Sequence, residues 1–152
     1  MKHLRTLVLA FGSAAILAAA ANAAAMKPAD RIRPWLGTWS CKAPGNNHTA
    51  TFSPIFGGTG MRMSETGKMA SEETVILDRK SGKWIDQYAD VTGAYNTMEG
   101  TQTGNTVRFT QTYPASNATL TVMMPKKNEF RTTFTGSMNG KTITQHEVCT
   151  RT

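Results

Sequence analysis

The chain has 152 residues, 17 Lys and Arg against 10 Asp and Glu, a formal net charge of +7 and two cysteines. This length fits one domain, which is large enough to bury a core without a dense disulfide framework. Two cysteines cannot supply the thiolates of a thiolate-rich zinc module or of an ordinary iron–sulfur cluster. The composition therefore excludes these metal sites, a knottin, a collagen and a multidomain enzyme.

The first 25 residues follow the order of a secretory signal peptide. A basic start with Lys2 and Arg5 precedes an apolar run over residues 6–20, and small residues follow up to Ala25. The apolar run of about 15 residues is shorter than the roughly 20 that span a bilayer. We therefore predict an exported protein, periplasmic or secreted, with no transmembrane anchor. Residues 26–152 then form a single domain with 15 basic and 10 acidic residues, a net charge of +5.

The rest of the chain consists of short β-like runs separated by turn signals. Residues 29–36 favour one short turn of helix, which Pro34 interrupts. Threonine is β-branched and suits strands, and 22 of the 23 threonines lie after residue 25. Gly and Asn recur between the runs, and Ser81-Gly82 and Asn139-Gly140 are typical hairpin turns. The pattern predicts ten strands, near residues 36–42, 48–56, 59–66, 72–79, 83–90, 94–100, 105–113, 118–125, 128–137 and 141–151.

These runs alternate between apolar and polar residues, which indicates antiparallel strands with one wet face. Val107 and Phe109 share one face of their strand, for example, and Arg108 and Thr110 share the other. A meander of ten strands would expose two edges unless it closes on itself. We therefore predict an all-β protein, an antiparallel up-and-down closed β-barrel of about ten strands.

The two cysteines lie on the first and last predicted strands. In an oxidising compartment we expect Cys41 and Cys149 to pair, and the absence of a C-x-x-C spacing favours a structural bridge over free thiols or a redox pair. A bridge would place the two terminal strands side by side. If the cysteines lie directly opposite each other, the same register sets Trp39 opposite Arg151. An arginine over a tryptophan forms a cation–π contact of about 0.5–2 kcal/mol.

Gly37-Thr38-Trp39 resembles the G-x-W motif that opens the first strand of lipocalins and other calycin barrels, which include the fatty-acid-binding and nitrobindin types. In lipocalins an arginine late in the chain packs across this tryptophan, and the resemblance implies that role for Arg151. Residues 35–41 and the final Cys149-Thr150-Arg151 are also similar to small exported bacterial proteins of unknown function. The resemblance implies a lipocalin-like barrel. The sequence lacks the lid helices of fatty-acid-binding proteins, which favours a plain barrel.

Some polar residues share strand faces with the apolar residues that should fill the barrel. Without partners, buried polar groups cost about 1–3 kcal/mol each. These residues therefore either line a polar cavity for a small ligand or reach solvent where their strands end at the barrel mouth. We predict as ligand-binding residues Asp86, Gln111, Thr132, Gln145 and Glu147.

Two further features offer metal ligands. Nitrobindin-type barrels bind haem through a histidine near the chain end, so the resemblance implies His146 as an axial ligand; if Gln145 and Glu147 face inward, however, His146 faces outward. Met61 and Met63 could offer thioethers to Cu(I), although core packing is the more ordinary role of methionine.

No nucleophile elbow, phosphate loop or dinucleotide fingerprint is present, so we expect neither an enzyme nor a cofactor. Basic residues are dispersed and are not interleaved with aromatic residues, which argues against a nucleic-acid partner. We predict a non-enzymatic exported barrel that binds a small ligand in its cavity. The alternatives are a haem or metal protein using His146 or the methionines, and a structural or interaction module with a filled barrel.

Overall fold

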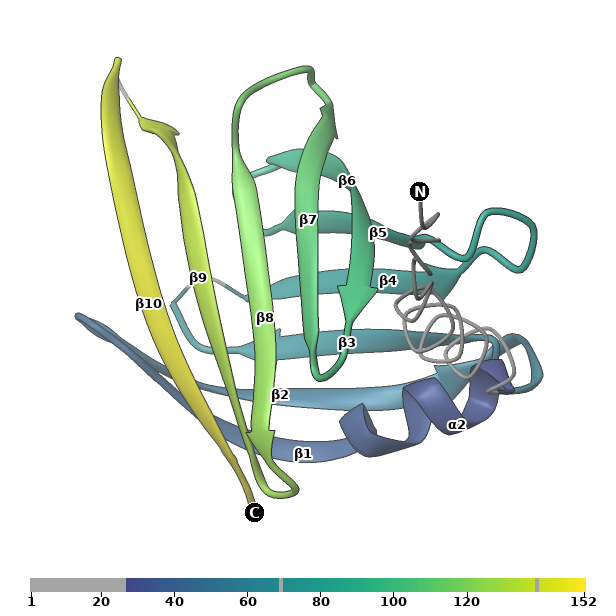
Figure 1. The fold of residues 1–152 in the computed structure, drawn as a ribbon. Helices are drawn as coiled ribbons and strands as arrows, with labels where there is room; N and C mark the ends of the chain where they lie inside the picture. The colour runs from purple at the N-terminus through teal and green to yellow at the C-terminus, as the bar shows by residue number, and fades with distance from the viewer. Residues whose placement is uncertain (1–26, 69, 139) are drawn as a thin grey trace, which may run out of the picture.

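The computed structural model describes residues 27–68, 70–138 and 140–152, and the predicted signal peptide lies outside them. Ten antiparallel strands form a closed barrel in which each strand pairs with its neighbours in the chain (Figure 1). Strand β1 pairs with β10, and this pairing closes the sheet. The predicted fold class, an all-β, antiparallel, up-and-down closed barrel, is confirmed.

The strands begin and end within three residues of the predicted positions. Tight turns set these limits, since Gly45 and Gly104 adopt φ angles of +77° and +58°, a region that favours glycine. The strands are β1 Gly37–Ala43, β2 Asn46–Ile55, β3 Gly60–Thr66, β4 Ser71–Leu77, β5 Trp84–Asp90, β6 Tyr95–Thr103, β7 Thr106–Tyr113, β8 Thr119–Lys126, β9 Glu129–Met138 and β10 Lys141–Arg151.

A short helical segment precedes the barrel and lies beside one end of it (Figure 1). It consists of the α-helix α2 (Pro28–Ile32) and the 3-10 turn η1 (Arg33–Trp35), with a proline near the start of each, where its missing N–H is tolerated. Ile32 and Trp35 are buried in the apolar core. We call this end of the barrel, covered by α2 and η1, the closed end.

The cysteines form the expected disulfide, and the two terminal strands are in the register that it requires. Cys41 lies opposite Cys149, and Trp39 lies opposite Arg151. The guanidinium carbon of Arg151 is 4.2 Å from the centroid of the Trp39 ring. The same guanidinium donates hydrogen bonds to the carbonyl oxygens of Leu36 and Pro34. Arg151 therefore joins the last strand to the backbone that enters the first strand.

A second arginine covers a second tryptophan at the closed end. The guanidinium carbon of Arg31, on α2, is 5.4 Å from the centroid of the Trp84 ring. Arg31 donates two hydrogen bonds to Oε1 of Gln102, and Nε1 of Trp84 donates to the same oxygen at 3.2 Å. The helix is thereby tied to strands β5 and β6.

Aromatic rings fill the interior of the closed end. The ring of Phe130 lies edge-on to Trp39, Trp35 and Phe52, with centroid distances of 4.8, 5.9 and 5.9 Å. Edge-to-face pairs of this kind add about 0.5–1.5 kcal/mol each beyond the area they bury. Among the described residues, no helix has the length and apolar character needed to cross a membrane.

Candidate ligand-binding cavity

The barrel contains a partly open cavity of about 380 Å³ between the closed end and the opposite end of the strands. This volume lies within the range of about 300–1,000 Å³ that is typical of small-molecule sites. Trp35, Trp84 and Phe130 line it on the side of the closed end. Strands β6 to β9 contribute mainly apolar side chains, and they include Met98, Phe109, Leu120 and Val122.

Four of the five residues predicted to bind a ligand line this cavity: Asp86, Thr132, Gln145 and Glu147. Gln111 does not. It lies near the end of β7, where its amide nitrogen donates a hydrogen bond of 2.7 Å to the carbonyl oxygen of Pro114. Gln111 therefore lies outside the cavity lining, at a strand end beside a loop.

The polar side of the cavity is formed by four carboxyl groups, which we call the acidic wall: Glu65 on β3, Glu73 on β4, Asp86 on β5 and Glu147 on β10. Asp86 is the most buried of them, with 3% of its surface exposed. Its Oδ1 atom has no hydrogen-bond partner within the described part of the chain. Burial raises the pKa of the Asp86 carboxyl to about 7. At neutral pH this group is therefore close to its titration midpoint.

Glu73 also favours its neutral form. Burial is the main cause that raises its pKa well above the usual range, and the nearby charges of Asp86, Glu65 and Glu147 raise it further. The four carboxyl groups are therefore close enough to affect one another's ionisation. Burial and the repulsion between like charges therefore both favour the neutral form of Glu73.

His48 on β2 lies between two members of the acidic wall. Its side chain is 5% exposed, and its Nε2 atom is 3.3 Å from Oε1 of Glu65 and 3.3 Å from Oε2 of Glu147. Ser71 donates a hydrogen bond of 2.8 Å to the other oxygen of Glu65. Burial raises the pKa of Glu147, an effect that the charge of His48 opposes without cancelling.

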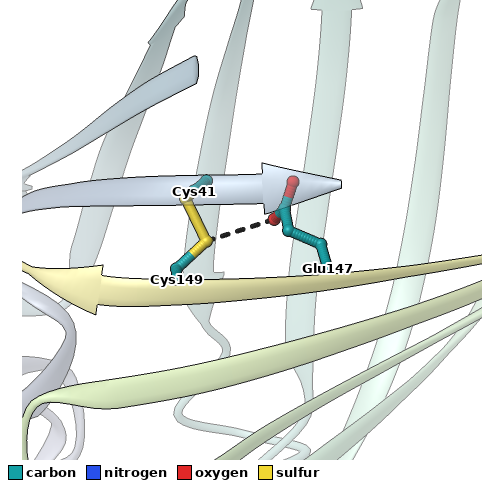
Figure 2. A group of neighbouring side chains, drawn as sticks. All are labelled: Cys41, Glu147 and Cys149. Atoms are coloured by element: carbon teal, nitrogen blue, oxygen red, sulfur yellow. Dashed lines mark hydrogen bonds between the residues drawn. A yellow bond between two sulfur atoms is a disulfide. The ribbon is translucent and has the colours of Figure 1, made fainter. Parts of the chain in front are cut away.

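The disulfide lies directly beside Glu147, as Figure 2 shows. Sγ of Cys149 and Oε1 of Glu147 are 3.2 Å apart. A disulfide sulfur carries no hydrogen, so Cys149 cannot donate a hydrogen bond to Glu147. The two sulfurs and this carboxylate lie close enough together to hold a metal. The sulfurs are bonded to each other, however, and cysteine binds metals as a thiolate rather than as a disulfide.

The other candidate ligands for metal or haem are divided between the two faces of the barrel. His146 is exposed on the outer face of β10, where its Nδ1 atom lies 3.1 Å from the hydroxyl oxygen of Thr133. It is absent from the lining of the cavity. Met61 and Met63 are buried and line the cavity wall among apolar neighbours.

Sequence reasoning missed Glu65, Glu73, Tyr88, Asn96 and His48. Their positions carry the same signal that identified Asp86, because side chains two residues apart point to the same face of a strand. Glu65 lies two residues after the buried Met63 on the same face of β3, for example, and His48 lies two residues before the buried Ala50 on the same face of β2. Extending the period-two pattern along every strand would have found them.

The geometry of the cavity is the basis for assigning a function, since neither a protein-family profile nor a curated protein sequence matches the chain.

Proposed function

We propose that this chain is an exported, non-enzymatic, lipocalin-like barrel that binds a small amphipathic molecule in its interior cavity. One observation carries the proposal. A cavity of about 380 Å³ contains a carboxyl oxygen of Asp86 that is buried and has no partner among the described residues. An unpaired buried acceptor costs about 1–3 kcal/mol, and a ligand that donates a hydrogen bond to it would offset that cost.

The two sides of the cavity support an amphipathic ligand. Strands β6 to β9 offer an apolar surface, and β3, β4, β5 and β10 carry the acidic wall. The apolar part of a ligand would pack against Phe109 and Leu120, and its polar part would face Asp86. Ligand sites commonly combine an apolar lining with a few polar groups that fix orientation.

The arrangement around His48 supports binding rather than hydrolysis. In a catalytic triad the histidine lies between the serine and the carboxylate, because it must take the proton of the serine. Here Glu65 occupies the middle position, between Ser71 and His48. The serine therefore has a carboxylate rather than an imidazole as its partner.

The proposal is tested with N-phenyl-1-naphthylamine, a neutral apolar dye that becomes fluorescent in dry sites. Val122 lines the cavity on β8, and Thr121 lies on the other face of the same strand. We expect the dye to bind wild type at one site, Val122→Trp to weaken binding about tenfold by filling the cavity, and Thr121→Trp to change it less than twofold.

Native mass spectrometry of the purified protein complements this assay by detecting molecules that co-purify. Dye binding that Val122→Trp leaves unchanged, or no dye binding and no co-purified molecule, would refute a binding cavity and favour a barrel without a ligand. A haemin titration addresses the alternative based on His146. We expect no Soret shift, because His146 lies on the outer face.

A further inference from the structure

The cavity concentrates one sign of charge in a chain that carries an excess of the other. Four of the ten acidic residues line it, and none of the Lys and Arg side chains in the described residues does so. Burying carboxyl groups is costly unless cations accompany them. The cavity therefore favours a ligand that carries a positive charge.

The protein supplies a basic partner to only part of the acidic wall. His48 contacts Glu65 and Glu147, whereas no Lys, Arg or His within the described residues forms an ion pair with Glu73 or Asp86. Tyr88 lines the cavity as well, but its hydroxyl donates to Asp90 at 3.0 Å. The unpartnered oxygen of Asp86 is an independent sign of a vacant acceptor.

We propose that the cavity selects a small organic cation, whose ammonium group pairs with Glu73 and Asp86 while its apolar body lies against β6 to β9, and that protons leave the acidic wall as the cation enters. This inference rests on the proposed function and specifies its ligand class. It predicts that neutral and anionic molecules of the same shape bind less tightly, because they leave the carboxyl groups unpaired.

The proton exchange follows from the groups that surround Asp86. The other titratable side chains of the cavity lining are Glu65 on β3, Glu73 on β4, Glu147 on β10 and, on β5 itself, Tyr88, whose hydroxyl bonds to Asp90. His48 on β2 contacts Glu65 and Glu147 from outside the lining, and β6 to β9 add no titratable group to it. With a pKa raised to about 7, the carboxyl of Asp86 is protonated at pH 5 and ionised at pH 8. Cation affinity should therefore rise with pH.

The test is calorimetry with three probes that share one apolar body, a phenyl ring on a four-carbon chain: 4-phenylbutylamine, 4-phenylbutan-1-ol and 5-phenylpentanoate. At pH 8 we expect the amine to bind at least about tenfold more tightly than the alcohol, and the carboxylate to bind most weakly. At pH 5 the advantage of the amine should shrink to about threefold or less. Near pH 7, titrations in phosphate and in Tris should show that amine binding releases protons.

Matched variants test whether the cavity carboxyl groups cause the preference for the amine. Asp86→Asn and Glu73→Gln keep the side-chain size and remove the charge, and each should weaken amine binding about tenfold while changing alcohol binding less than twofold. Glu72→Gln is the control, since Glu72 is exposed and points to the other face of β4. This control should leave all three affinities unchanged.

Three results would overturn the cation inference: an alcohol or carboxylate that binds as tightly as the amine, an amine affinity that Asp86→Asn leaves unchanged, or no binding by any of the probes. The dye assay separates this failure from that of the proposed function. Dye binding that Val122→Trp abolishes, combined with no preference for the amine, would retain the binding cavity and reject its charge selectivity.

Discussion

The closed end and the acidic wall use charged groups in opposite ways. At the closed end, Arg31 and Arg151 lie over tryptophan rings, and each also donates hydrogen bonds to oxygen acceptors. In the acidic wall, Glu73 and Asp86 lie inside the barrel without a basic partner among the described residues. One region uses its charges to stabilise the fold, whereas in the other the ionisation of buried carboxyl groups opposes folding.

The difference can be expressed as free energy. A pKa of about 7 for Asp86, against an ordinary value of 3.8, means that ionising this group inside the barrel costs on the order of 4 kcal/mol more than in the unfolded chain. Domains are stable by only about 5–15 kcal/mol, so this is a large fraction. Groups that reduce stability in this way are concentrated at functional sites, which is why the contrast points to the acidic wall.

The largest expected effect comes from the disulfide that links the first and last strands. Cys41 and Cys149 are 108 residues apart, so removing the bridge frees the unfolded chain and should lower the free energy of unfolding by about 4–5 kcal/mol. The Cys41→Ala/Cys149→Ala variant is measured by guanidinium denaturation without reductant. Reduced wild type should match it, and a variant as stable as oxidised wild type would contradict the expectation.

The aromatic packing of the closed end comes next. Phe130→Ala should lower the free energy of unfolding by roughly 3–5 kcal/mol, because it removes edge-to-face contacts with Trp35, Trp39 and Phe52 and leaves a cavity. Phe56→Ala is the control, since Phe56 is 68% exposed. Equal losses in the two variants would show that the closed end is not a packed core.

Arg151 tests the charged part of the closed end. Arg151→Ala should cost about 3 kcal/mol, since it removes the cation–π contact and the hydrogen bonds to two backbone carbonyls. Arg151→Lys should recover only part of this loss, because an ammonium group cannot reproduce the planar fork of the guanidinium group. Arg108→Ala, at an exposed position on β7, should cost less than about 0.5 kcal/mol. Full rescue by lysine would show that charge alone matters.

In the acidic wall, the sign of the effect should reverse. Between about pH 4 and pH 7, Asp86 holds a proton in the folded state that it has lost in the unfolded state. Its contribution to stability is therefore complete at low pH and is lost as the pH rises through about 7. Asp86→Asn should be nearly equal in stability to wild type at pH 4 and more stable than wild type at pH 8, by on the order of 4 kcal/mol.

Thermal denaturation of both proteins across this pH range measures the difference directly. Taking the difference removes the contribution of exposed carboxyl groups such as Asp78 and Asp90, whose pKa values are lowered by hydrogen bonds and which act in both proteins alike. An Asp86→Asn variant that is less stable than wild type at pH 8 would show that the ionised carboxyl has a partner in the folded protein.

The strands and the closure of the barrel could be predicted because they depend on local rules. Alternation identifies a strand, Gly and Asn mark its ends, and both signals lie within a few residues of each other in the chain. The disulfide and its register needed only one further step. Once Cys41 is opposite Cys149, antiparallel pairing determines that Trp39 is opposite Arg151.

The candidate site could be predicted only in part. Asp86 and Glu147 were identified from their strand faces, and Gln111 was selected by the same rule although it bonds to a loop carbonyl instead. Near a strand end the face of a residue no longer decides its surroundings, because a neighbouring loop can provide a partner. The face of His48 could have been found from the period-two pattern, but its contact with Glu147 could not, because β10 is far from β2 in the sequence.

The sequence by itself determined a ten-stranded closed barrel, its bridge and four of the polar residues that line its interior, because these follow from patterns with short periods. Only the tertiary structure decided that the interior retains a cavity and that four carboxyl groups gather on one side of it. An unfilled volume depends on how side chains from ten strands pack together. The charge of a cavity wall likewise depends on distances across the barrel, and no local pattern in a sequence encodes such distances.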